Sequence, residues 1–488
     1  MKNSIQEELP SLRNSLIELI KNWLSSINAY GIPKIFRSNI NLIMKIIWFS
    51  CVLASVGYCL YLLVQLIQMY TSFPSSISTE KVQEMPTQFP AVTICNLKTV
   101  NNAANLNFLN LVKNKTANQS TFEWISSIQY LMRAAVFNQN NETIRKSYGY
   151  QLENMLVSCH FNYNPCYLSD FTYFYDPLYG NCYTFNKQAP IKYVTIPGLS
   201  YGLTLELFLG NPPTETKYQF NDGIVVSIEN QSSIPFTDVE AIKAASSSET
   251  DIIVYRNFMT QLPDPYGNCL KDTTINSAFH SIYFDYIVNT LNGTYSHNYC
   301  YSLCVQKQII LNCSCSNLNM PMFANHTIIC KTSNDMLCVA FIVKNFGSTN
   351  ASVDCKAACP YKCDSIQYMM TTYNALYPTE FYSKVLHDDI TSKGFNINYN
   401  DAAKSFCKIN VYYLNMEYTM TIQTASMDAS TLFSNIFGTI NFCLGLNMFT
   451  IVEVFELFLF IFGILILRYS KRRNTKVHNL GKEVNSNS

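Results

Sequence analysis

Residues Ile46–Met69 read IIWFSCVLASVGYCLYLLVQLIQM, and no charged side chain interrupts them. A helix of about 20 apolar residues crosses the hydrocarbon core of a bilayer, so this stretch is long enough to span a membrane. The alternative is a buried helix in a globular core, for which an uncharged run of this length is unusual. The stretch therefore predicts a first transmembrane helix at 46–69.

A second apolar run, Phe433–Leu467, contains only two charged residues, Glu453 and Glu456. It is longer than one membrane crossing requires. A basic flank follows it, formed by Arg468 and Lys471–Arg473. We interpret 433–467 as a second transmembrane helix and 468–488 as a short tail.

Basic residues also precede the first run, at Lys34, Arg37 and Lys45. Because basic flanks of membrane spans remain in the cytoplasm, we expect both termini, 1–45 and 468–488, to be cytoplasmic. Residues 70–432 are then extracellular, and the protein lies in the plasma membrane. Residues 1–45 lack the early apolar core of a cleavable signal peptide, so we expect the first span to act as an uncleaved signal anchor.

Sequons for N-glycosylation provide an independent check of this topology. A single sequon is weak evidence, because Asn-x-Ser/Thr occurs often by chance. All eight lie between the two apolar runs, at Asn114, Asn118, Asn141, Asn230, Asn292, Asn312, Asn325 and Asn350. Their absence from both predicted cytoplasmic ends agrees with an extracellular middle segment.

The chain has 18 cysteines, which indicates disulfide bonds formed in an oxidising compartment. Fifteen lie between the apolar runs, and ten of these fall within Cys269–Cys363. That segment is typical of a small subdomain stabilised by several disulfides. A zinc site at Cys300, Cys304, Cys313 and Cys315 is the alternative. Because the number is odd, we expect one unpaired thiol.

Composition and motifs exclude other classes of protein. The formal net charge is +1, so no basic surface suggests a nucleic-acid partner, and the cluster Lys471–Arg473 is explained by its place beside a membrane span. No metal-binding His pair, nucleophile elbow or phosphate-binding loop is present. We expect no enzymatic activity, no catalytic residues, no cofactor and no bound metal.

The extracellular segment has the patterns of a mixed α+β fold. Short runs rich in β-branched and aromatic residues predict strands at 193–196, 203–209, 223–229, 252–256 and 408–423. The stretch 121–137 predicts a helix. We therefore expect two transmembrane helices that flank a large, disulfide-rich α+β ectodomain.

One phrase just after the first span, Phe89–Asn96 (FPAVTICN), resembles the degenerin/epithelial sodium channel family. Further landmarks follow in the order of that family: YGNCYTFN at Tyr179–Asn186, LPDPYGNC at Leu262–Cys269, C-x3-C-P-x2-C at Cys355–Cys363 and YPTEFY at Tyr377–Tyr382. The resemblance extends from about Gly31 to Glu456. The ectodomain landmarks are most similar to the peptide-gated (FMRFamide-type) and bile-acid-sensitive branches.

The resemblance implies a trimeric channel whose ectodomain has palm, finger, thumb, knuckle and β-ball regions. The finger would lie at about 97–180 and the thumb at about 265–370. The implied disulfides pair Cys95 with Cys182, Cys159 with Cys166, Cys269 with Cys363, Cys300 with Cys359, Cys304 with Cys355, Cys313 with Cys338, and Cys315 with Cys330. Cys407 is then the unpaired residue.

The presence of two carboxylates inside a membrane span requires an explanation, because a charge at the centre of a bilayer costs several kcal/mol unless it faces water or a partner. Glu453 and Glu456 lie three residues apart and therefore on one face of a helix. In a trimer, that face would present rings of carboxylates that attract cations. The alternative is a solvated helix end at the cytoplasmic interface, but eleven residues, Leu457–Leu467, still separate Glu456 from the basic flank.

The resemblance also assigns roles around this face. Gly445-Leu446-Asn447 stands at the selectivity belt, with Asn in place of the usual Ser. Gly31 supports a re-entrant loop, although the usual preceding His is Tyr30. Ser434 stands where bulky residues hold relatives open, and Asn441 stands at the pore-blocker site linked to amiloride. The aromatic pair that couples the thumb to the first span would be Tyr266 and Tyr70, although Tyr70 equally suits an interfacial aromatic belt.

These patterns predict a ligand-gated, sodium-preferring channel subunit opened by an extracellular stimulus, with a small peptide as one candidate. Its partners would be sodium ions, two further homologous subunits and the lipid bilayer, with no nucleic acid. Proton or mechanical gating is the alternative within the family. The alternative from another class is an accessory, non-conducting subunit that needs partners to carry current.

Overall fold

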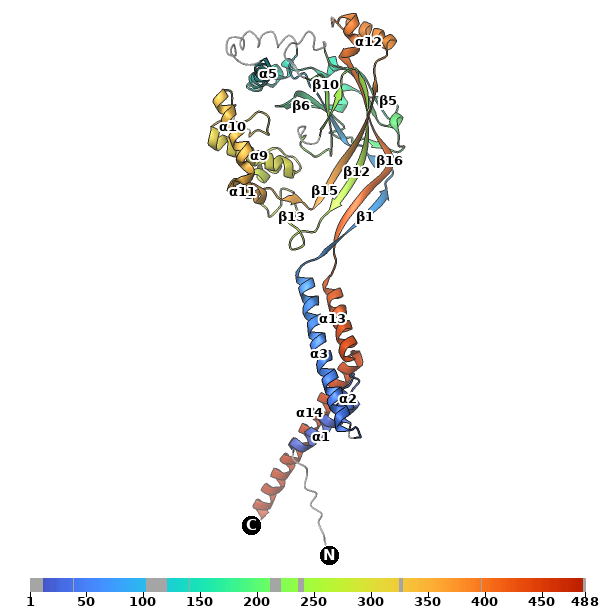
Figure 1. Cartoon of the computed structure of the whole chain (residues 1–488), viewed down its shortest axis with the longest axis vertical. Helices are drawn as coiled ribbons and strands as arrows, with labels where there is room; N and C mark the ends of the chain where they lie inside the picture. The colour runs from blue at the N-terminus through green and yellow to red at the C-terminus, as the bar shows by residue number, and fades with distance from the viewer. Residues whose placement is uncertain are drawn as a thin grey trace. The chain divides into compact units, whose positions relative to one another are not determined.

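The computed structural model describes residues 12–37, 39–101, 121–139, 141–210, 221–235, 241–323, 328–395 and 397–485 (Figure 1). The chain forms two compact units, one made of Met1–Ser76 with Ala425–Ser488 and the other of Ile77–Thr424. The first is helical, and the second contains strands, helices and seven disulfides. The predicted α+β class, with apolar helices on both sides of a disulfide-rich middle, is confirmed.

The helical unit has five helices in the described part of the chain: α1 (Leu12–Ser26), α2 (Ile32–Phe36), α3 (Leu42–Thr71), α13 (Ala429–Leu444) and α14 (Met448–Asn485). Helices α3 and α13 pack side by side (Figure 1). Within the described residues, two segments are long and apolar enough to cross a membrane, namely α3 and Met448–Leu467 of α14. Helix α3 extends beyond the predicted span 46–69 at both ends.

The second apolar run forms two helices instead of one continuous helix. Asp428 caps the start of α13, because its Oδ1 accepts a hydrogen bond from the Thr431 N–H at 2.8 Å. Helix α13 ends at Leu444, where Gly445 adopts a left-handed conformation with φ 68°. Helix α14 begins three residues later, at Met448.

The strand-rich unit is built on two larger sheets. One has the order β15-β12-β16-β9-β4-β5, with β1 also paired to β16. Its strands are β15 (Asp364–Leu376), β12 (Ser248–Thr260), β16 (Phe406–Ala425), β9 (Leu203–Phe208), β4 (Leu156–Phe161), β5 (Asn164–Pro165) and β1 (Ser75–Gln83). The other has the order β11-β10-β3-β7-β6, made of Ala241–Ala245, Gly223–Glu229, Ala91–Asn96, Gly180–Phe185 and Phe171–Asp176. Two-stranded pairs join β2 (Thr87–Gln88) to β8 (Tyr193–Val194) and β13 (Cys269–Leu270) to β14 (Tyr361–Lys362).

The predicted strands at 203–209, 223–229, 252–256 and 408–423 are confirmed as β9, β10, part of β12 and part of β16. The predicted strand 193–196 is too long, because β8 ends at Val194. Pro197 follows closely and has no N–H to donate to a ladder, so the chain bends before it. The predicted helix 121–137 is confirmed as α5 (Thr121–Phe137).

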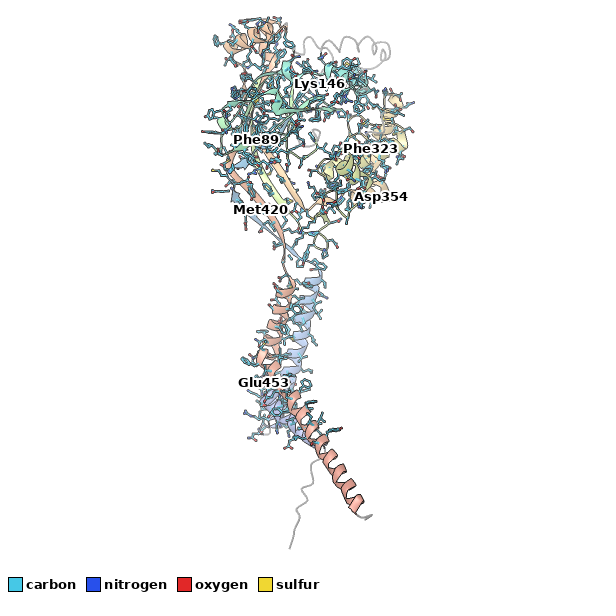
Figure 2. All side chains as sticks on the ribbon, turned by 180° about the vertical axis from the view of Figure 1, so that it is seen from behind. Phe89, Lys146, Phe323, Asp354, Met420 and Glu453 are labelled. Carbon is cyan, nitrogen blue, oxygen red and sulfur yellow. A yellow bond between two sulfur atoms is a disulfide. The ribbon has the colours of Figure 1, made fainter. Side chains whose placement is uncertain are left out.

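The core of this unit lies on the two larger sheets. All six residues of β3 are buried, which explains why its sequence is a nearly continuous apolar run instead of an alternating pattern. Just before it, Phe89 (labelled in Figure 2) packs its ring edge-on against Phe161 at 4.9 Å between centroids. The motif Phe89–Asn96 therefore consists of a buried core strand, β3, and the core residue Phe89 just before it.

The remaining α-helices in the described part of this unit are α6 (Glu142–Tyr148), α7 (Leu152–Met155), α8 (Ile282–Asp285), α9 (His297–Cys313), α10 (Ser333–Asn345), α11 (Asn350–Ala358) and α12 (Glu380–Ser392). Helices α9, α10 and α11 gather in one group, apart from the long strands β12, β15 and β16 (Figure 1). Helix α10 begins with a capping box, in which Thr332 and Asp335 satisfy each other's backbone N–H groups.

Five disulfides brace the segment Cys269–Cys363: Cys269–Cys363, Cys300–Cys359, Cys304–Cys355, Cys313–Cys338 and Cys315–Cys330. Two more join Cys95 to Cys182 and Cys159 to Cys166. All seven pairs are those that the family resemblance implies. The zinc alternative is wrong, because the four sulfurs that it requires are held in disulfides.

Cys407 is a free thiol on β16, and it is completely buried in the core. Burial in apolar surroundings raises the pKa of this thiol, since the thiolate would be poorly solvated there. We therefore interpret Cys407 as a small core side chain instead of a reactive group.

Candidate functional site

The break between α13 and α14 is held by the segment that precedes α2. The N–H of Gly445 donates to the carbonyl of Asn441 at 2.8 Å, and the N–H of Tyr30 donates to the carbonyl of Leu444 at 2.9 Å. A Cβ atom on Gly445 would lie 2.6 Å from Cγ of the Tyr30 ring. Glycine is thus required twice, for the left-handed backbone and for the approach of the ring.

Gly31 is a second position where only glycine fits. It has φ 77° and stands directly before α2. A Cβ atom there would lie 2.8 Å from Cγ2 of Val52 and 3.2 Å from the Trp48 ring, both on α3. The Tyr30-Gly31 pair therefore packs between α3 and the end of α13, in the place where the sequence predicted a re-entrant loop.

Asn447, the third residue of the predicted belt, caps the start of α14. Its Oδ1 accepts hydrogen bonds from the N–H and the hydroxyl of Thr450, at 3.2 and 3.3 Å. Its own N–H donates to the Thr450 hydroxyl oxygen at 3.2 Å. A serine could cap in the same way, which gives a structural reason why Asn can replace it.

The two carboxylates of α14 have different surroundings. Glu453 (Figure 2) accepts a hydrogen bond from the Asn28 N–H at 3.1 Å and another from the Asn28 side-chain amide at 2.5 Å. The indole N–H of Trp23 donates to the Glu453 carbonyl at 3.0 Å. Glu456 is exposed. Glu453 therefore anchors the N-terminal segment to α14, whereas Glu456 is open to its surroundings.

A cavity of about 750 Å³ lies beside the break. Asn441 and Asn447 supply amide groups to it, and Trp23, Phe437 and Ile451 are among its apolar walls. The predicted pore-blocker residue and the last belt residue thus line the same space. Its mixture of apolar walls and a few polar groups is typical of a small-molecule pocket.

The other predicted gating residues lie on separate elements. Ser434 is exposed on α13. Tyr70 is near the end of α3, with its ring centroid 6.4 Å from that of Phe73. Tyr266 belongs to the other unit, where its N–H donates to the Pro263 carbonyl at 3.1 Å.

Five of the eight predicted glycosylation sites lie in the described residues, all in the strand-rich unit. The side chains of Asn141, Asn292, Asn312 and Asn350 are exposed, and that of Asn230 is partly buried. Asn114, Asn118 and Asn325 lie outside the described residues.

Sequence reasoning missed Trp23, Asn28 and Thr450 and noted Tyr30 only as a departure from the family pattern. No local signal marks the contact of Asn28 with Glu453, which are 425 residues apart. The cap at Asn447 could have been found, because Asn is a favoured N-cap residue and Asn447 stands directly before an apolar run.

Comparison with known proteins gives a family for this arrangement. The sequence model of the family described as amiloride-sensitive sodium channel matches residues 23–457. The match begins at Trp23, whose indole contacts α14, and ends one residue after Glu456.

Three relatives are similar over most or much of the chain. Degenerin-like protein asic-2 of Caenorhabditis elegans is 25% identical, and the match covers 91% of this chain and 86% of the relative. The FMRFamide-activated amiloride-sensitive sodium channel of Cornu aspersum is 23% identical, and the match covers 92% of this chain and 84% of the relative. The epithelial sodium channel subunit beta of Homo sapiens is 26% identical, and the match covers 82% of this chain and 60% of the relative.

The family match spans most of the chain, including α3, the first part of α14, all seven disulfides and the Gly445 break. Two of these relatives are named as a sodium channel or a subunit of one, and the family's description is that of a channel and not of an enzyme. This chain is a membrane protein of the amiloride-sensitive sodium channel family, also called the degenerin/epithelial sodium channel family.

Proposed function

We propose that this chain is one subunit of a sodium-preferring channel in the plasma membrane, opened by an extracellular ligand. The observation that carries the proposal is the helix break at Gly445, which the N-terminal segment supports through Tyr30. Residues 70–432 would be extracellular and both termini cytoplasmic, in keeping with the basic flanks of the spans and the positions of the sequons.

Permeation would follow from three copies of the α13–α14 break meeting around one axis. Gly445, Leu446 and Asn447 would then form a narrow belt, and three copies of Glu456 would attract cations below it. Glu453 would act as a positioning residue, because its carboxylate is already bound by Asn28. The cavity lined by Asn441 would receive pore blockers such as amiloride.

A peptide is the ligand class best supported, because one of the relatives is named as FMRFamide-activated. Tyr70 and Tyr266 would transmit ligand binding from the ectodomain to the first span. Mechanical gating is the alternative within the family, in keeping with the similarity to a degenerin-like protein.

A second candidate is an accessory subunit that conducts only with partners. The specific observation in its favour is Asn447, a larger side chain in place of the usual Ser of the family's belt. Expression of this chain alone separates the two functions. Ligand-evoked sodium current with no other subunit supports the homomeric channel, and abundant surface protein that never conducts under peptides, bile acids, protons or stretch supports the accessory role.

Ser434→Phe is expected to raise resting current several-fold over wild type. Ser434 is exposed on α13 and, by the family resemblance, stands at the small-residue position where bulky side chains hold relatives open. Whole-cell current, normalised to surface protein, measures the effect. Ser430→Phe, one turn earlier and also exposed, is the matched control and should leave resting current near the wild-type level. Equal resting currents in wild type and Ser434→Phe would contradict the assigned role.

A further inference from the structure

Asn230, the first residue of a sequon, lines a cavity of about 350 Å³ in the strand-rich unit, called here the sequon cavity. It also lines a second cavity of about 330 Å³, and Ser233 and Ile366 are common to both. The two cavities therefore adjoin at Asn230. Each lies within the range of about 300–1,000 Å³ that is typical of sites for small molecules.

The turn that carries Asn230 is fixed by hydrogen bonds. The Asn230 carbonyl accepts from the Ser233 N–H at 3.0 Å, directly after β10. The Gln231 side-chain amide donates to the Phe89 carbonyl at 2.6 Å, which ties the turn to the core. Within the described residues, the side-chain amide of Asn230 itself makes no hydrogen bond. A group attached to Asn230 would therefore start from a defined position beside the sequon cavity.

The walls of the sequon cavity combine aromatic rings with hydroxyl groups. The rings of Phe258 and Tyr418 lie 4.5 Å apart between centroids, and Met420 (labelled in Figure 2) adds apolar surface. Thr260 and Ser365, whose side chains carry hydroxyl groups, also line the cavity.

A sugar ring has a matching distribution of groups. C–H groups cover the faces of a pyranose, and they pack well against the electron-rich face of an aromatic ring. Hydroxyl groups surround its edge, where they can both donate hydrogen bonds to and accept them from the hydroxyls of Thr260 and Ser365. The sequon cavity therefore suits a carbohydrate.

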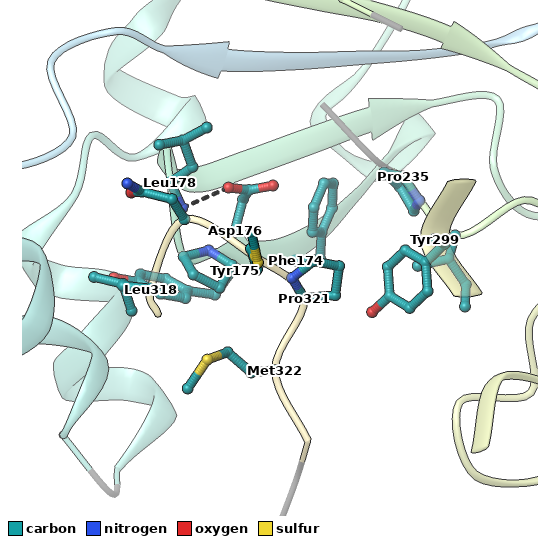
Figure 3. A pocket seen from close by; sticks show the side chains of 13 residues that line it. Phe174, Tyr175, Asp176, Leu178, Pro235, Tyr299, Leu318, Pro321 and Met322 are labelled. Carbon is teal, nitrogen blue, oxygen red and sulfur yellow. Dashed lines mark hydrogen bonds between the residues drawn. The ribbon is translucent and has the colours of Figure 1, made fainter. Parts of the chain in front are cut away.

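Another cavity of the same unit, of about 220 Å³, lacks the feature that points to a carbohydrate (Figure 3). Pro235 and Tyr299 are among its walls, and none of the described residues that line it is a sequon asparagine. A glycan would have no attachment point in that wall. At the sequon cavity, by contrast, Asn230 supplies the attachment point directly.

We propose that an N-linked glycan on Asn230 folds back into the sequon cavity, where its two core N-acetylglucosamine units pack against Phe258 and Tyr418. In the transfer, Asn230 Nδ2 forms a bond to the anomeric carbon of a lipid-linked oligosaccharide diphosphate. The bond from that carbon to the diphosphate oxygen breaks, the lipid diphosphate leaves, and Nδ2 loses one proton. Because the transfer takes place on the nascent chain, the partial burial of Asn230 in the folded protein does not prevent it.

The bound glycan core would connect the two larger sheets. Asn230 follows β10 of one sheet, whereas Phe258, Ser365 and Tyr418 belong to β12, β15 and β16 of the other. The glycan would thus act as a structural ligand that fills a cavity between strands, in contrast to glycans that extend into solvent. This inference rests on the extracellular location proposed above for residues 70–432.

Digestion with endoglycosidase H, which cuts between the two core N-acetylglucosamine units, tests the proposal without measuring current. The full chain is purified from cells that make only high-mannose glycans and is digested both native and denatured. Mass spectrometry of the peptides follows cleavage at each sequon. In the native chain, cleavage at Asn230 should be at least tenfold slower than at Asn141 and Asn350, whose side chains are exposed. After denaturation the three rates should be equal.

Phe258→Ala and Tyr418→Ala should each raise the native cleavage rate at Asn230 to within twofold of the rate at Asn350, because they remove the rings that cover the glycan core. Tyr373→Ala is the matched control: Tyr373 is 61% exposed on β15 and lines neither cavity, so protection should persist. Gel filtration shows whether each variant is folded.

Two results would overturn the proposal: an Asn230 peptide without a glycan, or a glycan there that is cut in the native chain as fast as those on Asn141 and Asn350. If all three sequons lacked glycans, the extracellular location would be contradicted as well. A failure confined to Asn230 would leave the proposed channel function in place. A protected glycan on a chain that conducts no current would support this inference and contradict the homomeric channel.

Discussion

Gly445→Ala is expected to reduce current at least tenfold at equal surface expression. Gly445 has φ 68°, a conformation that costs a residue with a Cβ atom about 1–2 kcal/mol. The added Cβ would also lie 2.6 Å from the Tyr30 ring. Either the helix break or the Tyr30 segment must shift, and the belt would lose its geometry. Whole-cell recording, normalised to biotinylated surface protein, measures the loss.

Gly463→Ala is the matched control for this substitution. Gly463 lies in α14, and nothing lies within 4 Å of a Cβ atom built there. Alanine should therefore be tolerated or slightly stabilising in that helix. The double variant Tyr30→Ala/Gly445→Ala relieves the overlap but not the backbone strain, so it should recover part of the current. Full activity of Gly445→Ala would show that the glycine-dependent helix break is not required for conduction.

Asp222→Ala is expected to destabilise the strand-rich unit by about 3–5 kcal/mol, the usual cost of removing one partner of a buried ion pair. The Lys98 ammonium lies 3.1 Å from Asp222 Oδ1, and the Lys98 side chain is completely buried. Burial already lowers the pKa of Lys98, and Asp222 opposes that effect. Thermal unfolding of the detergent-solubilised chain, followed by gel filtration, should show a midpoint lower by several degrees.

Lys81→Ala provides the comparison, because Lys81 pairs with Glu417 at 3.3 Å while 72% of its side chain is exposed. Such a surface pair contributes about 0–1 kcal/mol, so its loss should barely change the midpoint. The double variant Lys98→Leu/Asp222→Leu replaces the pair by apolar groups and should be more stable than Asp222→Ala. Equal unfolding midpoints for Asp222→Ala and Lys81→Ala would show that the buried Lys98–Asp222 pair contributes no more to stability than the exposed pair.

Much of the fold could be predicted because it depends on local pattern. The uncharged stretch Ile46–Met69 marks α3, and the runs at 203–209 and 223–229 mark β9 and β10. The disulfide pairs came from the family resemblance and not from spacing, since 14 bonded cysteines allow very many pairings. The one overlong strand, 193–196, shows how a nearby proline shortens a run that is otherwise rich in β-branched residues.

The candidate site was only partly predictable, because its contacts join the two ends of the chain. Gly445 and Glu453 could be found from resemblance and from the cost of a charge in a membrane. Their partners Tyr30 and Asn28 could not, since nothing local to either residue indicates a neighbour more than 400 positions away. The unequal surroundings of Glu453 and Glu456 likewise depend on which residues the N-terminal segment brings to α14.

The most direct test of the central claim is the reversal potential of current carried by this chain alone. The belt around Gly445–Asn447 is proposed to prefer sodium, so replacing external sodium with potassium should move the reversal potential to more negative values. A reversal potential that does not change on this replacement, in cells with ample surface protein and ligand-evoked current, would contradict a sodium-preferring belt.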